Sequence, residues 1–184
     1  MLTITIPATE LFDEQSQTFF TTKEQTLQME HSLVSLSKWE SKWHKSFLAS
    51  QEKQNSLTLE ETLDYFKCMT ITQNVDPSVY QYMTRSNIEQ INNYISDPMT
   101  ATTFYEMQQN TGKKEVVTSE LIYYWMIALN IPMECQKWHL NRLLTLIRVC
   151  NIKNNPPKKM GKRETASRYA ALNAARRKQF NSKG

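Results

Sequence analysis

Glycine is scarce in this chain of 184 residues, which contains only three. A phosphate-binding loop needs several closely spaced glycines, because its backbone N–H groups must approach the phosphates without side chains in the way. Three glycines spread over the chain cannot build such a loop. Their scarcity therefore argues against a nucleotide-binding enzyme of that kind.

Cysteine is equally scarce, and Cys68, Cys135 and Cys150 form neither an even set nor a CxxC pair. This pattern predicts reduced, partly buried thiols in a cytosol rather than a disulfide framework. Cys135 stands four residues before His139, a spacing that could place two metal ligands on one helix face. A structural zinc ion needs four ligands, and neither residue has a further partner motif. We therefore expect no metal ion and no cofactor.

Long apolar runs are missing too, since no stretch approaches the roughly twenty residues that cross a bilayer. The first residues, MLTITIPATE, have neither the basic start nor the apolar run of a secretory signal. We expect a protein that has no membrane partner and is not exported by such a signal.

Recognisable catalytic patterns are also lacking. Only three histidines are present, and no Ser-His-Asp or Cys-His arrangement is detectable around them. Glu60, Glu61 and Asp64 crowd one predicted helix start, where carboxylates interact favourably with the helix dipole. We interpret them in that way and not as paired acid–base catalysts, so the chain is predicted not to be an enzyme.

What the chain does have is a strong division of charge. From residue 153 onward, ten basic residues stand against one acidic residue, Glu164, which leaves this stretch at +9. Because the whole chain holds 22 basic and 18 acidic residues, residues 1–152 keep 12 and 17 of them, a net charge of −5. An acidic body with a basic arm predicts a partner that is acidic, either nucleic acid or an acidic protein surface.

Strands are predicted mainly near the N-terminus. Residues 2–6, 18–22 and 26–33 alternate in polarity or are rich in β-branched and aromatic residues, and they should form a small antiparallel sheet. Residues 100–107 return to this composition, and 115–118 could pair back with them as a hairpin.

Helices are predicted wherever a start signal precedes apolar residues at helical spacing. Ser37 with Glu40, Thr58 with Glu61, and Ser86 with Glu89 each fit a capping box, and Asp76 precedes a proline suited to a first helical turn. The corresponding helices cover about 35–47, 58–69, 86–96 and 77–83, and residues 49–57 are interpreted as a loop.

The strongest helical signal covers residues 119–151. Residues 121–129 are apolar nearly all round, which predicts a helix enclosed by protein. Asn130 and Pro132 break the chain, and a second helix with a long apolar face is predicted over 133–150. Together the two segments predict a buried helical hairpin at the centre of the fold.

Two consecutive prolines, Pro156 and Pro157, must end this second helix. We therefore predict a globular body over residues 1–153 and a basic tail over 154–184, flexible or conditionally helical until a partner binds it. The predicted fold class is α+β and predominantly α-helical. It has a small N-terminal antiparallel β element, a helical body with the buried helical hairpin, and the basic C-terminal tail.

Tryptophan supplies two further candidates for binding. Trp39 and Trp43 lie at i,i+4 among lysines, which suits nucleic-acid stacking, but they continue an apolar stripe and are interpreted as core residues. Trp138 lies off the predicted apolar face, where it either fills a second layer of the core or anchors a partner. The candidate partner-binding residues are Trp138, Lys158, Lys159, Lys162, Arg163, Arg168, Arg176, Arg177 and Lys178.

Four segments resemble a known protein family. They are HSLVSLSKWESKWHKSFL (31–48), CMTITQNVDPSVY (68–80), PMTATTF (98–104) and IYYWMIALNIPMECQKWHLNRLLTLIRVCN (122–151). These segments are similar to small proteins encoded in the tail-gene cluster of long-tailed bacteriophages, usually beside the tape-measure gene and described as tail assembly chaperones. The resemblance covers nearly the whole chain and brings no catalytic residues with it.

The resemblance implies a non-enzymatic chaperone of virion morphogenesis that coats the long helical tape-measure protein, keeps it soluble in the host cell cytoplasm and leaves before the tail tube closes. Its partners would be the tape-measure protein and other phage tail proteins, with self-association in multiple copies. Two other functions stay open. One is a structural virion subunit, such as a head–tail connector or tail component, and the other is a nucleic-acid-binding protein that uses the basic tail.

Overall fold

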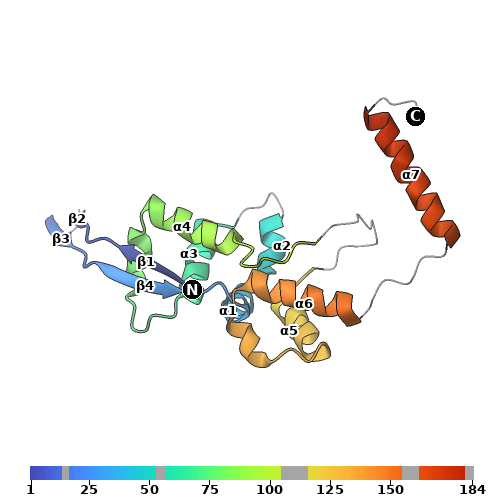
Figure 1. Cartoon of the computed structure of the whole chain (residues 1–184). Coiled ribbons are helices and arrows are strands. Elements are labelled where there is room, and N and C mark those ends of the chain that lie inside the picture. Colours follow the sequence, from blue (N-terminus) through green and yellow to red (C-terminus); the bar gives the residue numbers. More distant parts are fainter. Residues whose placement is uncertain (14–16, 53–56, 105–115, 155–161, 181–184) are drawn as a thin grey trace. The chain divides into compact units, whose positions relative to one another are not determined.

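The computed structural model describes residues 1–13, 17–52, 57–104, 116–154 and 162–180 (Figure 1). The chain divides into two units, Met1–Cys150 and Asn151–Gly184, which are described separately. The fold is α+β and mainly α-helical, with antiparallel strands near the N-terminus, as predicted. The predicted division after residue 153 falls near the end of the first unit.

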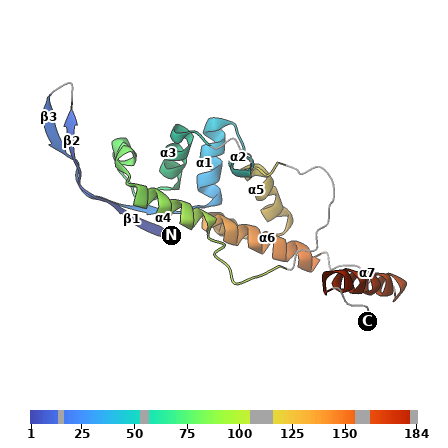
Figure 2. The same ribbon diagram turned by 90° about the horizontal axis from the view of Figure 1, so that it is seen from above.

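Two antiparallel strand pairs form the β part of the first unit. β1 (Leu2–Ile6) pairs with β4 (Gln25–Met29), and β2 (Glu10–Asp13) pairs with β3 (Thr18–Thr21). In both views the β2–β3 ribbon extends beyond β1 and β4, away from the helices (Figures 1 and 2). Alternate residues of β1 and β4 are buried and so cover the helical core. The strand at 10–13 was not predicted, because its two acidic residues hide the alternation.

α1 (Leu33–Trp43) begins earlier than predicted, and the strand before it is shorter. The Ser32 hydroxyl accepts a hydrogen bond from the Ser35 N–H, and the Ser35 hydroxyl accepts one from the Ser32 N–H. This reciprocal cap starts the helix, so the predicted box of Ser37 and Glu40 is wrong. His44 ends α1 with a φ of 53°. α2 (Phe47–Glu52) then occupies part of the predicted loop, because Phe47 is anchored in the core.

Two of the three following start signals are confirmed. Thr58 and Glu61 cap α3 (Leu59–Met69) reciprocally, and Asp76 caps η1 (Pro77–Tyr82), which is a short 3-10 helix. α4 (Arg85–Ser96) starts after Thr84 instead of Ser86, since Asn87 completes an equivalent box with Thr84. The Asn87 amide also donates to the Thr5 carbonyl at 3.1 Å, which ties α4 to β1.

The third part of the body contains α5 (Ser119–Ala128), η2 (Met133–Lys137) and α6 (Leu140–Asn154). The predicted second helix therefore starts too early, because η2 is a 3-10 turn and Trp138 is extended before α6. The Leu140 N–H donates to the His31 carbonyl at 2.7 Å, which fixes where α6 begins. α5 packs mainly on α1, which lies between α3 and α5 (Figure 2).

The core of this unit collects apolar side chains from β1, β4 and the helices. Trp39, Phe47 and Tyr65 are almost completely buried, and the rings of Phe47 and Tyr65 stack with centroids 3.8 Å apart. Burial of side chains this large contributes roughly 1.5–3 kcal/mol each. The interpretation of Trp39 as a core residue is confirmed, whereas Trp43 is half-buried and donates from Nε1 to Asp64.

The second unit contains α7 (Lys162–Phe180), a helix of 19 residues. Its described side chains are exposed, including those of Tyr169 and Leu172. The tail is therefore helical over this range, and its dependence on a partner stays a prediction. The hairpin predicted over 100–107 and 115–118 falls partly on residues 105–115, which lie outside the described residues; 100–104 and 116–118 contain no strand.

Candidate protein-interaction surface

Two of the three histidines, His31 and His139, are core residues. His31 Nδ1 lies 2.5 Å from the Tyr65 hydroxyl, and the His31 and His139 rings meet edge to face at 5.1 Å. His139 Nε2 lies 2.9 Å from the Tyr94 carbonyl, which can only accept, while His139 Nδ1 accepts from the Asn141 N–H. Both ring nitrogens of His139 therefore have hydrogen-bond partners. Burial lowers the pKa of His31 to about 3.

The predicted placement of Cys135 and His139 on one helix face is wrong. Cys135 lies in η2, whereas His139 precedes α6, and the extended Trp138 separates them. Within the described ranges, no three His, Cys, Asp or Glu side chains are close enough together to hold a metal ion. The residues that could have formed a metal centre instead pack in the interior.

The acidic residues at the start of α3 serve as a cap and in ion pairs. Glu61 accepts from the Thr58 N–H and pairs with Lys45, and these hydrogen bonds hold its pKa below the usual range. Burial alone would raise the pKa of Asp64, but hydrogen bonds from Lys42 and Trp43 lower it. Both carboxylates are therefore ionised and occupied, which suits stability and does not suit general acid catalysis.

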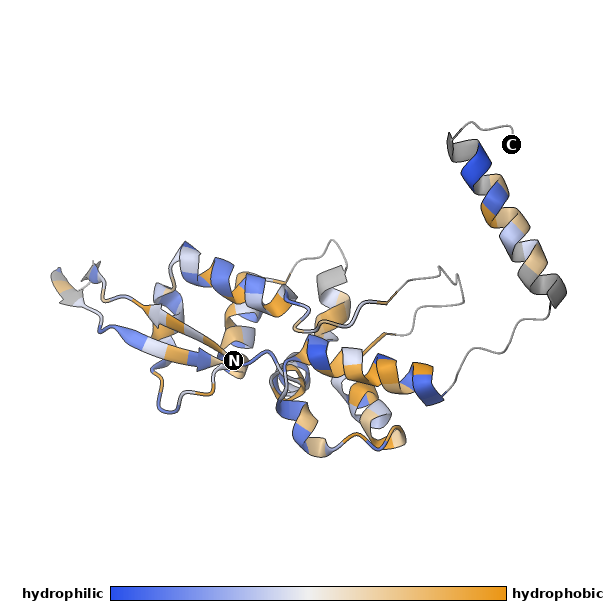
Figure 3. Cartoon of the chain, in the orientation of Figure 1, coloured by the Kyte–Doolittle hydropathy of each residue, from blue (hydrophilic) through white to orange (hydrophobic). Residues whose placement is uncertain are grey.

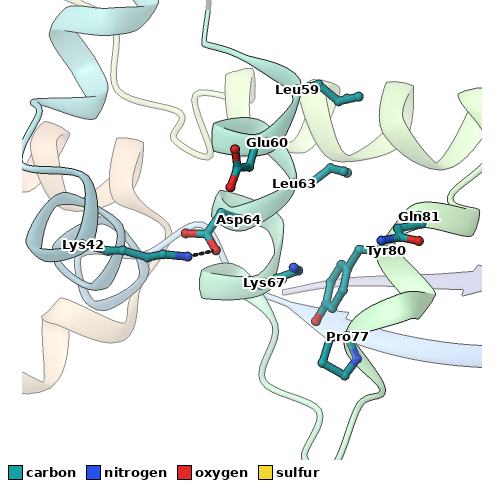
Figure 4. A pocket seen from close by; sticks show the side chains of 9 residues that line it. All are labelled: Lys42, Leu59, Glu60, Leu63, Asp64, Lys67, Pro77, Tyr80 and Gln81. Atoms are coloured by element: carbon teal, nitrogen blue, oxygen red, sulfur yellow. Dashed lines mark hydrogen bonds and ion pairs between the residues drawn. The ribbon is translucent and has the colours of Figure 1, made fainter.

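A surface hollow of about 390 Å³ lies between α3 and η1 (Figure 4). Leu59, Leu63 and Tyr80 form its apolar side, and the Lys42–Asp64 pair lies at its other side. The Lys67 ammonium stands 5.7 Å from the centre of the Tyr80 ring. Among the described residues, no buried side-chain nitrogen or oxygen lacks a hydrogen-bond partner. Charged side chains, including Glu60 and Lys67, line the hollow together with the apolar ones, so its lining does not single out one kind of ligand.

The body carries an apolar stripe on the exposed side of α5. We define the α5 outer face as Glu120, Tyr124, Ile127 and Ala128, which recur at helical spacing and are exposed. The side chains of Tyr124 and Ile127 are 63% and 66% exposed. The opposite side of the helix, with Ile122 and Met126, is buried. The prediction that this helix is enclosed by protein is therefore wrong.

Hydrophobic residues run along both α5 and α6 (Figure 3). The Tyr123 hydroxyl donates to the Gln136 side chain at 2.9 Å, so η2 is tied to α5. Met133, at the start of η2, is also exposed. The sequence showed that this region is apolar, but only the packing of α5 on α1 shows which of its residues face outward.

Trp138, a predicted partner-binding residue, lies at the surface between η2 and α6. Its side chain is 36% exposed, and the Arg142 guanidinium lies over the ring at 4.3 Å from the ring centre. Trp138 therefore lies at the surface and does not fill a second layer of the core. A rigid aromatic ring with one face covered by arginine is a suitable anchor for a partner, and that role stays a prediction.

All the predicted partner-binding residues other than Trp138 are basic and belong to the second unit. Lys158 and Lys159 lie outside the described residues. Four of the predicted residues lie along α7 without a described side chain, whereas Arg176 and Arg177 are exposed. These four are Lys162, Arg163, Arg168 and Lys178.

Comparisons with models of protein families, with curated proteins and with solved structures find no match to this chain. The family resemblance therefore continues to rest on the sequence segments that carry it. No helix in the described part of the chain combines the length and the apolar character needed to span a bilayer.

Proposed function

We propose that this protein is a non-enzymatic tail assembly chaperone of a long-tailed bacteriophage, and that it binds the tape-measure protein through the α5 outer face. The observation that supports this most is the exposure of Tyr124 and Ile127 on a helix whose other side is anchored in the core. An exposed apolar stripe on a rigid element is typical of a protein-binding surface.

The geometry of the α5 outer face suits a helical partner. Tyr124 and Ile127 are three residues apart and so lie one above the other along the helix. The apolar stripe of a second helix can pack its side chains against such a pair. A tape-measure protein is a long helix whose apolar side chains would aggregate in water if they were left uncovered.

The small size of the stripe also suits a temporary cover. Two apolar side chains bury little surface, so one copy would bind weakly and dissociate readily. Many copies along one long helix add their contacts, which gives a stable coat that can still be removed stepwise. This arrangement accounts for binding during assembly in the host cell cytoplasm and for release before the tube closes.

The occupied polar groups of the body support a function without catalysis. Glu61, Asp64 and His139 each have partners that hold them in a structural role. A chaperone needs none of these groups to react. Self-association in multiple copies belongs to the same proposal, because neighbouring copies would lie side by side on one tape-measure helix.

Co-expression with the tape-measure protein of the same phage tests the proposal. We expect the soluble fraction of the tape-measure protein to rise with the wild-type protein and to stay low with Ile127→Asp, because a charge on the stripe must be desolvated in the contact. Leu59→Asp, at an equally exposed leucine beside the hollow, is the matched control. Loss of solubility with Leu59→Asp alone would place the contact at the hollow.

Purified virions separate the chaperone from a structural subunit. A chaperone that leaves before the tube closes should be absent from them, whereas a head–tail connector or tail component should be present in stoichiometric amount. Quantitative mass spectrometry of virions, calibrated on a known tail protein, measures this directly. A stoichiometric amount in the virion would replace the chaperone proposal with the structural one.

A further inference from the structure

Among the described helices, α7 differs from the others in what surrounds it. The helices of the body each contribute to the core, whereas the described side chains of α7 are exposed along its length. Its 19 residues include five alanines and four arginines, and both residue types have a high intrinsic helix propensity. A helix built in this way exposes its surface to a partner rather than to the core.

The charge of α7 is high and of one sign. Residues 162–180 hold six basic residues and one acidic residue, Glu164. Arg176 and Arg177 are both exposed, and consecutive helical residues point about 100° apart. Positive charge is therefore presented to more than one side of the helix.

A protein groove is a poor match for this surface. A helix that docks in an apolar groove presents anchors at i, i+3 or i+4, and i+7. Tyr169 and Leu172 supply the first two of these, but the i+7 position is Arg176. The apolar stripe of α7 is thus interrupted after one turn, and charge dominates its surface.

We infer that α7 is a DNA-binding helix that lies in the major groove of double-stranded DNA. An α-helix with side chains is about 10–12 Å across, and the major groove of B-form DNA is about 12 Å wide. Phosphates line both walls of that groove, which matches arginines on more than one side of the helix. The alanines between them have small side chains, so the helix can approach the base edges closely.

The length of α7 sets the size of the site. Nineteen residues at about 1.5 Å each span roughly 28 Å, or about eight base pairs of DNA. The acidic body, with its net charge of −5 over residues 1–152, repels phosphate. The contact is therefore confined to the basic unit, and it is mainly electrostatic and independent of base sequence.

Other nucleic acids fit α7 less well. The major groove of double-stranded RNA is deep and too narrow to admit side chains. Single strands are bound on a series of aromatic side chains, and after Tyr169 the next aromatic residue of the helix is Phe180, about three turns later. Double-stranded DNA is the nucleic acid that matches both the width and the charge of the helix.

Fluorescence anisotropy of the full-length protein with a labelled 20-base-pair DNA duplex tests this inference. With about six phosphate contacts, affinity should fall roughly a thousandfold between 50 and 200 mM salt. In Arg176→Ala/Arg177→Ala, binding should weaken, and the slope of log affinity against log salt should fall by about two. Arg176→Lys/Arg177→Lys keeps the charge and should retain most of the binding.

The matched control removes the same charge from the body. Lys38 and Lys137 are exposed there, and Lys38→Ala/Lys137→Ala should leave DNA binding and its salt slope unchanged. Equal loss in both double variants, equal or tighter binding of a duplex RNA of the same sequence, or no binding at 50 mM salt would each overturn the inference.

This inference is independent of the proposed chaperone function. Arg176→Ala/Arg177→Ala should still keep the tape-measure protein soluble, and Ile127→Asp should still bind DNA. If the arginine variant instead lost the tape-measure protein and kept its DNA affinity, α7 would be a contact for an acidic protein surface and not for DNA.

Discussion

Glu40 and Ser119 lie 79 positions apart, and a short hydrogen bond joins them in the core. The Ser119 N–H, at the first residue of α5, donates to Glu40 Oε2 at 2.7 Å, and the Phe47 N–H, at the start of α2, donates to Glu40 Oε1 at 3.0 Å. The first N–H groups of a helix have no acceptor within it. One buried carboxylate on α1 therefore supplies acceptors for two helices and holds α5 with its outer face toward solvent.

Replacing Glu40 should destabilise the body strongly. In Glu40→Ala, two buried N–H groups lose their acceptor, and each unsatisfied donor costs about 1–3 kcal/mol. We expect a loss of roughly 2–6 kcal/mol in the free energy of unfolding, measured by urea denaturation. Glu40→Gln keeps one acceptor oxygen and should cost less.

The control for this substitution is Glu89, a glutamate of α4 that forms an ion pair with Arg85 at the surface. Exposed i,i+4 ion pairs contribute about 0.3–0.5 kcal/mol, so Glu89→Ala should have a small effect. Similar losses in Glu40→Ala and Glu89→Ala would show that Glu40 does not join the three helices.

Local signals in the sequence predicted which helices exist better than they predicted the residue at which each helix starts. The cap formed by Thr58 and Glu61 was predicted correctly, because Thr58 has a glutamate three residues later, whereas the nearby Ser56 has Leu59 at that position. Before α1, both Ser32 and Ser37 could have served, and the sequence alone favoured Ser37. Ser32 is the cap because the first residue of α6 binds the residue before it: the Leu140 N–H donates to the His31 carbonyl. This contact joins distant segments, so no local sequence pattern contains it.

Burial was predicted less well than helix position. The segment of α5 is apolar on every side, and its exposure depends on whether a neighbour covers each side. α5 packs on α1 and buries Ile122 and Met126, whereas Tyr124 and Ile127 are exposed. The candidate contact surface on α5 was therefore missed, although its residues were recognised as strongly apolar.

His31 should make the protein less stable as the pH falls below neutrality. Burial beside His139 lowers the pKa of folded His31 to about 3, and the unfolded chain binds this proton near the ordinary value of 6.5. Between these two values the unfolded state holds a proton that the folded state lacks. The stability is thus present above pH 6.5 and is lost as the pH falls, by about 2 kcal/mol at pH 5.

Urea unfolding between pH 7.5 and 5 measures this effect. The pKa values of Glu61 and Asp64 are lowered from the ordinary values of 4.5 and 3.8. These two groups therefore change the stability only near and below those pH values and contribute little between pH 7.5 and 5. His31→Asn removes the titrating ring while keeping a polar atom toward Tyr65, and it should flatten the dependence on pH even though it lowers stability overall.

The matched variant for the pH experiment is His44→Asn. His44 is exposed and adopts a left-handed backbone with a φ of 53°, which asparagine tolerates. This variant should keep the wild-type loss of stability between pH 7.5 and 5. An unchanged slope in His31→Asn would assign the pH dependence to a different group.

Two adjacent residues of α5 give the sharpest test of how this helix is placed. Met126 is fully buried, and Ile127 is 66% exposed, so the same new charge meets opposite environments one residue apart. Met126→Asp buries a carboxylate without a partner and should cost more than about 3 kcal/mol. Ile127→Asp leaves its carboxylate in water and should change stability by less than about 1 kcal/mol. Thermal and urea unfolding of both variants decide the matter, and a large loss in Ile127→Asp would mean that the α5 outer face is covered within the protein itself.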